Sequence, residues 1–146
     1  MSVSLKQVGA GEGYLPPSDD LTLPWWDATR EHRLLLQTCA ACRSVQHYPR
    51  YVCLGCGSTG HLGWEESSGR GVIDTFTVVH RAARPDLEVP YVVARIRLAE
   101  GPVILSNVID VRPDDVESGA LVVLEWRDLS DGRALPVFVV ESEDAA

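Results

Sequence analysis

The stretch LLLQTCAACRSVQHYPRYVCLGCGSTGHLGW, residues 34–64, contains all four cysteines of the chain. They form two Cys-x-x-Cys pairs separated by ten residues. A two-residue gap lets one tight turn bring two thiolates to the edge of a tetrahedron, and two such turns complete the shell of a metal ion. Gly55 and Gly57 flank one cysteine and permit a sharp turn. The pattern predicts a small ribbon with one structural Zn²⁺, held by Cys39, Cys42, Cys53 and Cys56.

Other roles for the cysteines fit the pattern less well. Catalytic zinc keeps one coordination position open, whereas four thiolates close the shell. Thioredoxin-like exchange needs Cys-x-x-Cys at a helix start, and here the strand-like RLLLQT precedes the first pair. Rubredoxin-type iron uses similar pairs, and zinc is favoured because no redox partner segment is visible. His47 and His61 are interpreted as ordinary histidines beside the metal site.

The residues before the ribbon are expected to form an arm and a helix. Residues 1–20 are rich in glycine and proline without apolar periodicity, and are interpreted as a flexible arm. LTLPWWDATREHRLL, residues 21–35, predicts a short helix, with Thr22 as its cap and Pro24 in its first turn. We assign the helix and ribbon together to residues 21–66.

Residues 67–142 alternate in the manner of β-strands. Turn signals lie at Glu100-Gly101 and at Ser130-Asp131-Gly132. Five short strands of this kind predict an OB-fold barrel, with a β-sandwich as the alternative. The fold class is therefore mainly β. The expected strands are GVIDTFTVVHR, PYVVARIRLAEG, PVILSNVID, ALVVLEWRDL and RALPVFVVES.

Composition narrows the function. Hydrophobic residues make up 45% of the chain and charged residues 23%, as in globular proteins. Thirteen Lys and Arg against 21 Asp and Glu give a formal net charge of -8, which argues against a nucleic-acid partner. The N-terminal residues have no signal-peptide pattern, and no apolar run approaches the length of a membrane span. A cytoplasmic protein without a membrane partner is expected.

A search for chemistry within the chain finds no catalytic constellation. The serines lie in no nucleophile elbow, and no glycine-rich turn matches a phosphate loop. His80, Arg81 and Arg84 end one strand and enter a loop, where they would suit a phosphate or a carboxylate. The alternative is a solvated strand end. We therefore do not expect the chain to be an enzyme by itself.

Several segments together resemble a known family. These are the paired Trp25-Trp26, the motifs LLLQTCAAC and HYPRYVCLGC, and the later motifs GRGVIDTFTVVHRA, PYVVARIRLAEGPVILSNV and VVLEWRDLSDGRALPVF. Over residues 20–140 the chain resembles the acyl-CoA-associated proteins that join a rubredoxin-like zinc ribbon to an OB-fold. These are small partner subunits of thiolases and of thiolase-like aldolases of the lipid-transfer-protein type.

The resemblance implies an accessory subunit that acts in trans. Its ribbon and helix would dock on a thiolase-fold partner in a heterotetramer, and its OB-fold would help form the acyl-CoA passage. Steroid side-chain degradation or a related acyl-CoA pathway is the expected setting. The alternatives are a nucleic-acid-binding ribbon and OB module, or a stand-alone acyl-CoA-binding protein. Candidate contacts to CoA or partner are Trp25, Trp26, Tyr48, Arg50, Tyr51, His80, Arg81 and Arg84.

Overall fold

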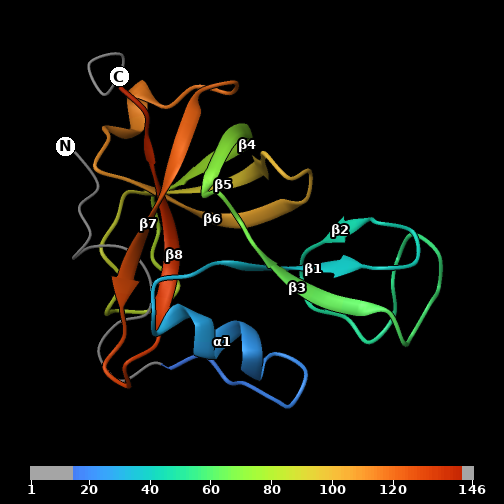
Figure 1. Ribbon diagram of the computed structural model, residues 1–146. Helices are drawn as coiled ribbons and strands as arrows, with labels where there is room; N and C mark the ends of the chain where they lie inside the picture. The colour runs from blue at the N-terminus through green and yellow to red at the C-terminus, as the bar shows by residue number, and fades with distance from the viewer. Residues whose placement is uncertain (1–14, 143–146) are drawn as a thin grey trace.

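The computed structural model describes residues 15–142, so most of the predicted N-terminal arm lies outside the described residues. The chain forms a three-stranded sheet that projects sideways from a closed β-barrel, with one short helix beneath both (Figure 1). The prediction of a mainly β protein with a ribbon and a five-stranded barrel is confirmed. The described residues include no helix with the length and apolar character needed to cross a bilayer.

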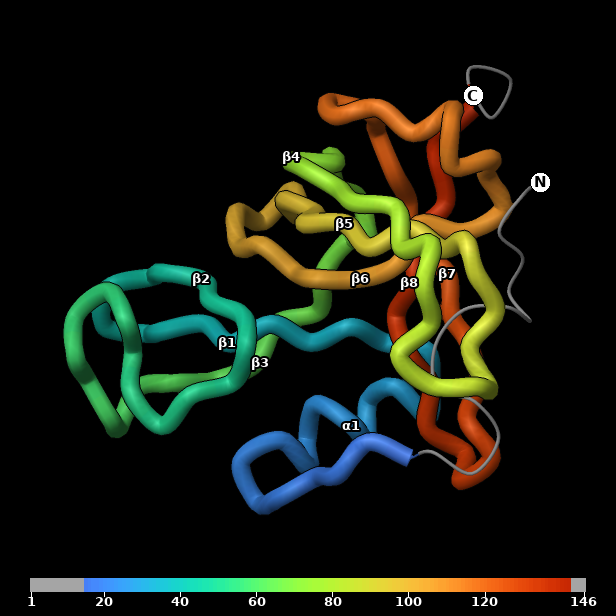
Figure 2. Tube along the Cα trace, turned by 180° about the vertical axis from the view of Figure 1, so that it is seen from behind, coloured from blue at the N-terminus to red at the C-terminus, as the bar shows by residue number. Residues whose placement is uncertain are grey.

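The small sheet comprises β1 (Leu35–Cys39), β2 (Val45–Gln46) and β3 (Leu62–Glu66). β1 lies in the middle and pairs antiparallel with both neighbours. The first cysteine is the last residue of β1, so the metal-binding turns lie at the end of the sheet that is remote from the barrel (Figure 2).

The five strands that follow β3 in the chain form the barrel. Its hydrogen-bonded order is β4-β5-β6-β8-β7, closed by pairing of β7 with β4. All neighbours are antiparallel except β6 and β8, which run parallel. A short 3-10 turn, Pro113–Asp115, lies in the predicted loop between β6 and β7. The strands are β4 (Arg70–Val79), β5 (Tyr91–Leu98), β6 (Val103–Ile109), β7 (Leu121–Asp128) and β8 (Ala134–Val140).

Ribbon and barrel share one apolar core. The alternate residues of β5 are buried, as its period-two pattern predicts. Phe138 of β8 is fully buried among them, and Leu34 and Leu36 enter the same cluster from the ribbon side. Gly71 allows β4 to approach β5 closely, since a Cβ there would lie 2.9 Å from the Arg97 carbonyl oxygen. The two units are therefore packed together as well as joined by the chain.

The helix α1 spans Leu23–Thr29 and is shorter than predicted. Pro24 lies in its first turn as expected. The predicted cap is wrong in its chemistry: Thr22 precedes the helix, but its hydroxyl donates to the Asp19 carboxylate at 2.9 Å instead of capping α1. The helix ends at Thr29, and in the turn that follows His32 has a left-handed φ of 55°.

Polar contacts fix α1 to the hairpin between β7 and β8. The Ala134 N–H donates to the Thr29 hydroxyl at 3.1 Å, and Arg30 donates to the Asp131 carbonyl at 2.8 Å. The Arg133 guanidinium lies 4.7 Å from the centre of the Trp26 ring, a cation–π contact. These contacts fix the position of the two tryptophans relative to the barrel.

Candidate metal centre and adjoining cleft

The four cysteine side chains converge at the outer end of the ribbon. Their Sγ atoms all lie within 4.8 Å of one another, with Cys39 and Cys56 at 3.8 Å and Cys42 and Cys53 at 3.5 Å. A tetrahedral metal with bonds of about 2.3 Å to sulfur requires sulfur–sulfur separations of about 3.8 Å. The donor set therefore fits one metal ion with a closed shell of four thiolates.

The two cysteine turns are built alike. In the first, the Cys39 N–H donates to the Ser44 carbonyl, and the Arg43 N–H donates back to the Cys39 carbonyl at 2.7 Å. In the second, the Cys53 N–H donates to the Ser58 carbonyl, and the Gly57 N–H donates back to the Cys53 carbonyl at 2.8 Å. This shared pattern is what places two thiolates on one edge in each turn. It also places Arg43 and Gly57 in equivalent left-handed positions, with φ of 64° and 77°.

One hydroxyl links the two turns. Ser44 Oγ lies 2.9 Å from Cys42 Sγ and 3.2 Å from Cys53 Sγ. Its hydrogen bonds lower the pKa of both thiols, that of Cys53 to about 6. The Gly55 N–H adds a further bond to Cys53 Sγ at 3.3 Å. This environment favours the thiolate form that a metal requires.

Two buried glutamines hold the loop between the turns. Gln37 accepts from the Arg50 N–H at 2.7 Å and donates to the Arg50 carbonyl at 2.9 Å. Gln46, its cross-strand partner, donates to Gln37 and to the Val52 carbonyl and accepts from the Leu54 N–H. Sequence reasoning missed this pair. The available signal was glutamine at inward-facing positions of both strands beside the first cysteine pair.

The predicted contact residues of the ribbon lie on that loop. Tyr51 is the most exposed of them at 69%, and Tyr48 is exposed at 47%. Arg50 projects its side chain to solvent while its main chain is bound by Gln37. His61 bonds Ser58 at 2.6 Å and lies outside the group of metal-binding side chains.

The two tryptophans point in different directions, as expected for neighbours. Trp25 belongs to the shared core, while Trp26 is half-buried and meets it edge-on at 4.7 Å between ring centres. Both contribute to a cavity of about 350 Å³ between α1, the ribbon loop and the barrel. Its lining comprises Thr22, Trp25, Trp26, His47, Tyr48, Pro49, Ile104, Leu105, Ser106, Asn107, Leu135, Pro136 and Val137.

His47 is the buried titratable group of this cleft. Its ring nitrogens and Trp25 Nε1 have no hydrogen-bond partner among the described residues. Burial, and then the positive charge of Arg50, lowers the pKa of His47 to about 4. The histidine is therefore neutral at physiological pH, and the cleft is uncharged.

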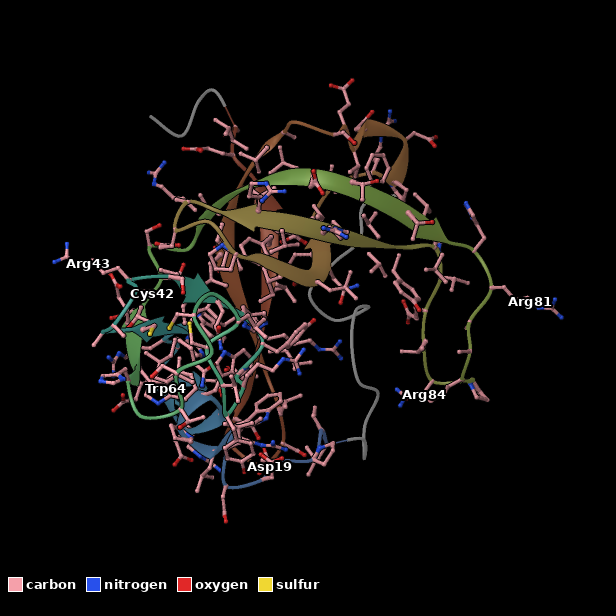
Figure 3. All side chains as sticks on the ribbon, turned by 90° about the vertical axis from the view of Figure 1, so that its right-hand side faces the viewer. Asp19, Cys42, Arg43, Trp64, Arg81 and Arg84 are labelled. Atoms are coloured by element: carbon pink, nitrogen blue, oxygen red, sulfur yellow. The ribbon has the colours of Figure 1, made fainter. Side chains whose placement is uncertain are left out.

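The remaining predicted group lies elsewhere. His80 follows the last residue of β4, and the loop after it carries Arg81 and Arg84 on the opposite side of the molecule from the ribbon turns (Figure 3). The two arginine side chains point away from each other, and Arg84 pairs with Asp86 at 3.0 Å. The structure thus brings together the predicted contact residues of the helix and of the ribbon loop. It separates them from the loop that carries Arg81 and Arg84.

Known family models match both units. The model described as the ChsH2 rubredoxin-like zinc ribbon domain matches residues 26–61. The model described as the ChsH2 C-terminal OB-fold domain matches residues 64–127. Together they cover the second half of the helix, the cysteine cluster and most of the barrel.

Relatives agree with these models. A probable enoyl-CoA hydratase alpha subunit of Thermomonospora curvata is 38% identical over 78% of this chain, which spans only 35% of that protein. A DUF35 domain-containing scaffold protein of Methanocaldococcus jannaschii is 30% identical over 77% of this chain and 82% of its own length. In the solved structure of an Ltp2-ChsH2(DUF35) aldolase, one chain matches with a TM-score of 0.79 and 35% identity, over 86% of this chain and 98% of that one.

Proposed function

Because this chain belongs to the DUF35 family and has the zinc ribbon and OB-fold of ChsH2, we propose that it is the small subunit of a thiolase-like aldolase or thiolase complex. The likeness to the chain of the Ltp2-ChsH2(DUF35) aldolase carries the proposal, because it extends over nearly all of that chain. The scaffold name of the archaeal relative supports a role in assembly.

The substrate class is an acyl-CoA thioester, as in steroid side-chain or related degradation. The names of two relatives support this class: the hydratase subunit of T. curvata and a 3-oxo-4,17-pregnadiene-20-carboxyl-CoA hydratase alpha subunit of Mycobacterium tuberculosis, 30% identical over 80% of this chain and 37% of that one. In our proposal the partner performs the carbon–carbon chemistry. This chain is non-catalytic and helps form the acyl-CoA passage. His80, Arg81 and Arg84 are candidates for CoA phosphate contacts.

The metal in this proposal is a structural Zn²⁺. Four thiolates at tetrahedral separations suit zinc and leave no coordination position for water or substrate. The ion would hold the loop that carries Tyr48, Arg50 and Tyr51, which together with Trp26 would face the partner. Residues 21–66 would then be the docking unit and residues 67–142 the passage unit, with residues 1–20 as an arm.

Co-expression tests the proposal. In our proposal the chain and its thiolase-fold partner should co-purify as a heterotetramer with two copies of each. Aldol cleavage or thiolysis of an acyl-CoA should depend on both chains. A partner whose activity is the same with and without this chain would contradict the proposal. Salt-sensitive binding of single-stranded DNA by the purified chain would favour the nucleic-acid alternative.

A further inference from the structure

The barrel is open along part of one seam. β6 and β8 pair only at Val108 with Phe138 and at Ile109 with Val139. Before these pairs the strands diverge, β6 starting near the ribbon and β8 starting near α1 (Figure 1). Residues 103–107 of β6 therefore pair with β5 on one side and with no strand of the described residues on the other.

The two sides of this opening are not equivalent. On β8, Pro136 has no N–H to donate, and its carbonyl already accepts a hydrogen bond from the Ser106 hydroxyl at 2.8 Å. Proline on an edge strand blocks further strand pairing. β6 has no proline within residues 103–107. The available strand edge of the opening is consequently that of β6.

Two cavities follow this edge end to end. The 350 Å³ cavity lies beside residues 104–107, and one of about 290 Å³ lies beside Pro102 and Val103. His47 lines both, so the two cavities adjoin at this residue, and together they are called the groove between β6 and the ribbon. The second cavity is lined by Ser44, Val45, Gln46, His47, Leu54, Gly55, Pro102 and Val103.

The groove is uncharged in a strongly acidic chain. None of its lining residues is Asp, Glu, Lys or Arg, although the chain has 21 acidic and 13 basic residues. Depletion of charge and enrichment in Trp and Tyr characterise the centre of protein interfaces. Such walls match an occupant that is itself uncharged and apolar, because a charge would lose its water without gaining a partner.

We infer that the groove receives an extended, uncharged and mainly apolar segment of the thiolase-like partner, laid along the edge of β6. A strand edge beside side-chain pockets is what an added β-strand recognises: main-chain bonds supply affinity and the pockets supply specificity. Residues 103–107 accommodate about five residues, or about 17 Å, of such a segment. Trp26, Tyr48 and Leu105 would close over its side chains. The inference rests on the proposed function and specifies its contact.

Amide hydrogen exchange tests the inference directly. In the purified complex of the full chain with its thiolase-fold partner, amides of residues 103–107 should exchange at least about tenfold more slowly than in the free chain. Amides of residues 121–124 at the start of β7 should be unchanged. A stable complex without protection at residues 103–107 would overturn the groove while leaving the proposed function intact. Absence of any complex would overturn both.

Matched substitutions provide a second measurement. Leu105 and Leu121 are both 56% exposed on the barrel, but only Leu105 lines the groove. L105R should raise the Kd for the partner about tenfold or more, and L121R should change it less than twofold. Equal effects would contradict the inference. Octanoyl-CoA alone should not protect the amides of residues 103–107. Protection by octanoyl-CoA without protection by the partner would indicate a small-molecule site and overturn the proposal.

Discussion

The ribbon and the barrel are stabilised by different interactions. The barrel surrounds an apolar cluster in which Phe138, Ile96 and Val92 are fully buried. The outer half of the ribbon has no comparable cluster, and its strands are only two to five residues long. There, four thiolates and the hydrogen bonds of Gln37 and Gln46 replace apolar burial. The core of a unit of this size is small, which is consistent with a metal site at its four cysteines.

The difference does not make the two units independent. Leu34 and Leu36, at the inner end of the ribbon, belong to the barrel core. The inner ribbon should therefore share the barrel's stability, while the cysteine turns depend on the metal. Four experiments test this division, in order of decreasing expected effect.

Removal of the metal should have the largest effect. C53S should release the ion and unfold residues 39–61, because metal binding supplies on the order of 10 kcal/mol to such sites. The barrel should keep its thermal transition. Metal content, hydrogen exchange and calorimetry measure the three quantities. L54S, which changes the exposed neighbour, should keep the metal; unfolding of the whole chain by C53S would show that the barrel also depends on it.

F138A should have the second largest effect. Phe138 is fully buried, so its truncation should cost about 3–5 kcal/mol in free energy of unfolding. Because the core is shared, protection at Leu34 and Leu36 should fall together with that of the barrel. Denaturant unfolding checks the magnitude. The exposed L121A should stay within about 0.5 kcal/mol of wild type.

Acidification should weaken the contact between the units through His47. Its folded pKa is about 4, below the ordinary value of 6.5, so the unfolded chain takes up the proton first as pH falls. The free energy of unfolding that neutral His47 contributes is therefore fully present above about pH 6.5 and is lost toward pH 4. Between pH 7 and pH 5 wild type should lose about 2 kcal/mol more than H47F. Both proteins lose the metal in acid, so that effect cancels when the stability loss of H47F is subtracted from that of wild type. Equal losses would contradict the burial of His47.

The smallest effects on metal affinity should come from substitutions at the equivalent left-handed positions of the two cysteine turns. G57A places a side chain at a left-handed residue and should weaken metal binding, whereas R43G relieves the same strain and should strengthen it. Each change should be about 1 kcal/mol or less, or up to about fivefold in affinity. Competition with a chelator measures both. Changes in the same direction would show that the turns are not equivalent.

Much of the fold was predictable from local pattern. The Cys-x-x-Cys spacing predicted the cluster, and the period-two alternation of residues 91–98 predicted a half-buried strand. Thr22 was predicted correctly as the N-cap residue, but its hydroxyl donates to the Asp19 carboxylate, a contact within the preceding turn that competes with side-chain capping of α1. The glutamine pair was missed because its bonds to the loop depend on the pairing of β1 with β2, a register that the sequence does not display.

The sequence by itself determined the cysteine cluster and the positions of the strands along the chain, since both follow from residue types at short spacing. Only the tertiary structure decided the cleft. Its walls come from segments between Thr22 and Val137, and the open edge of β6 exists because β8 pairs with it at two positions alone. Residues so far apart in the chain are brought into contact only by the packing of the ribbon, the helix and the barrel. That packing forms the surface proposed to receive a partner.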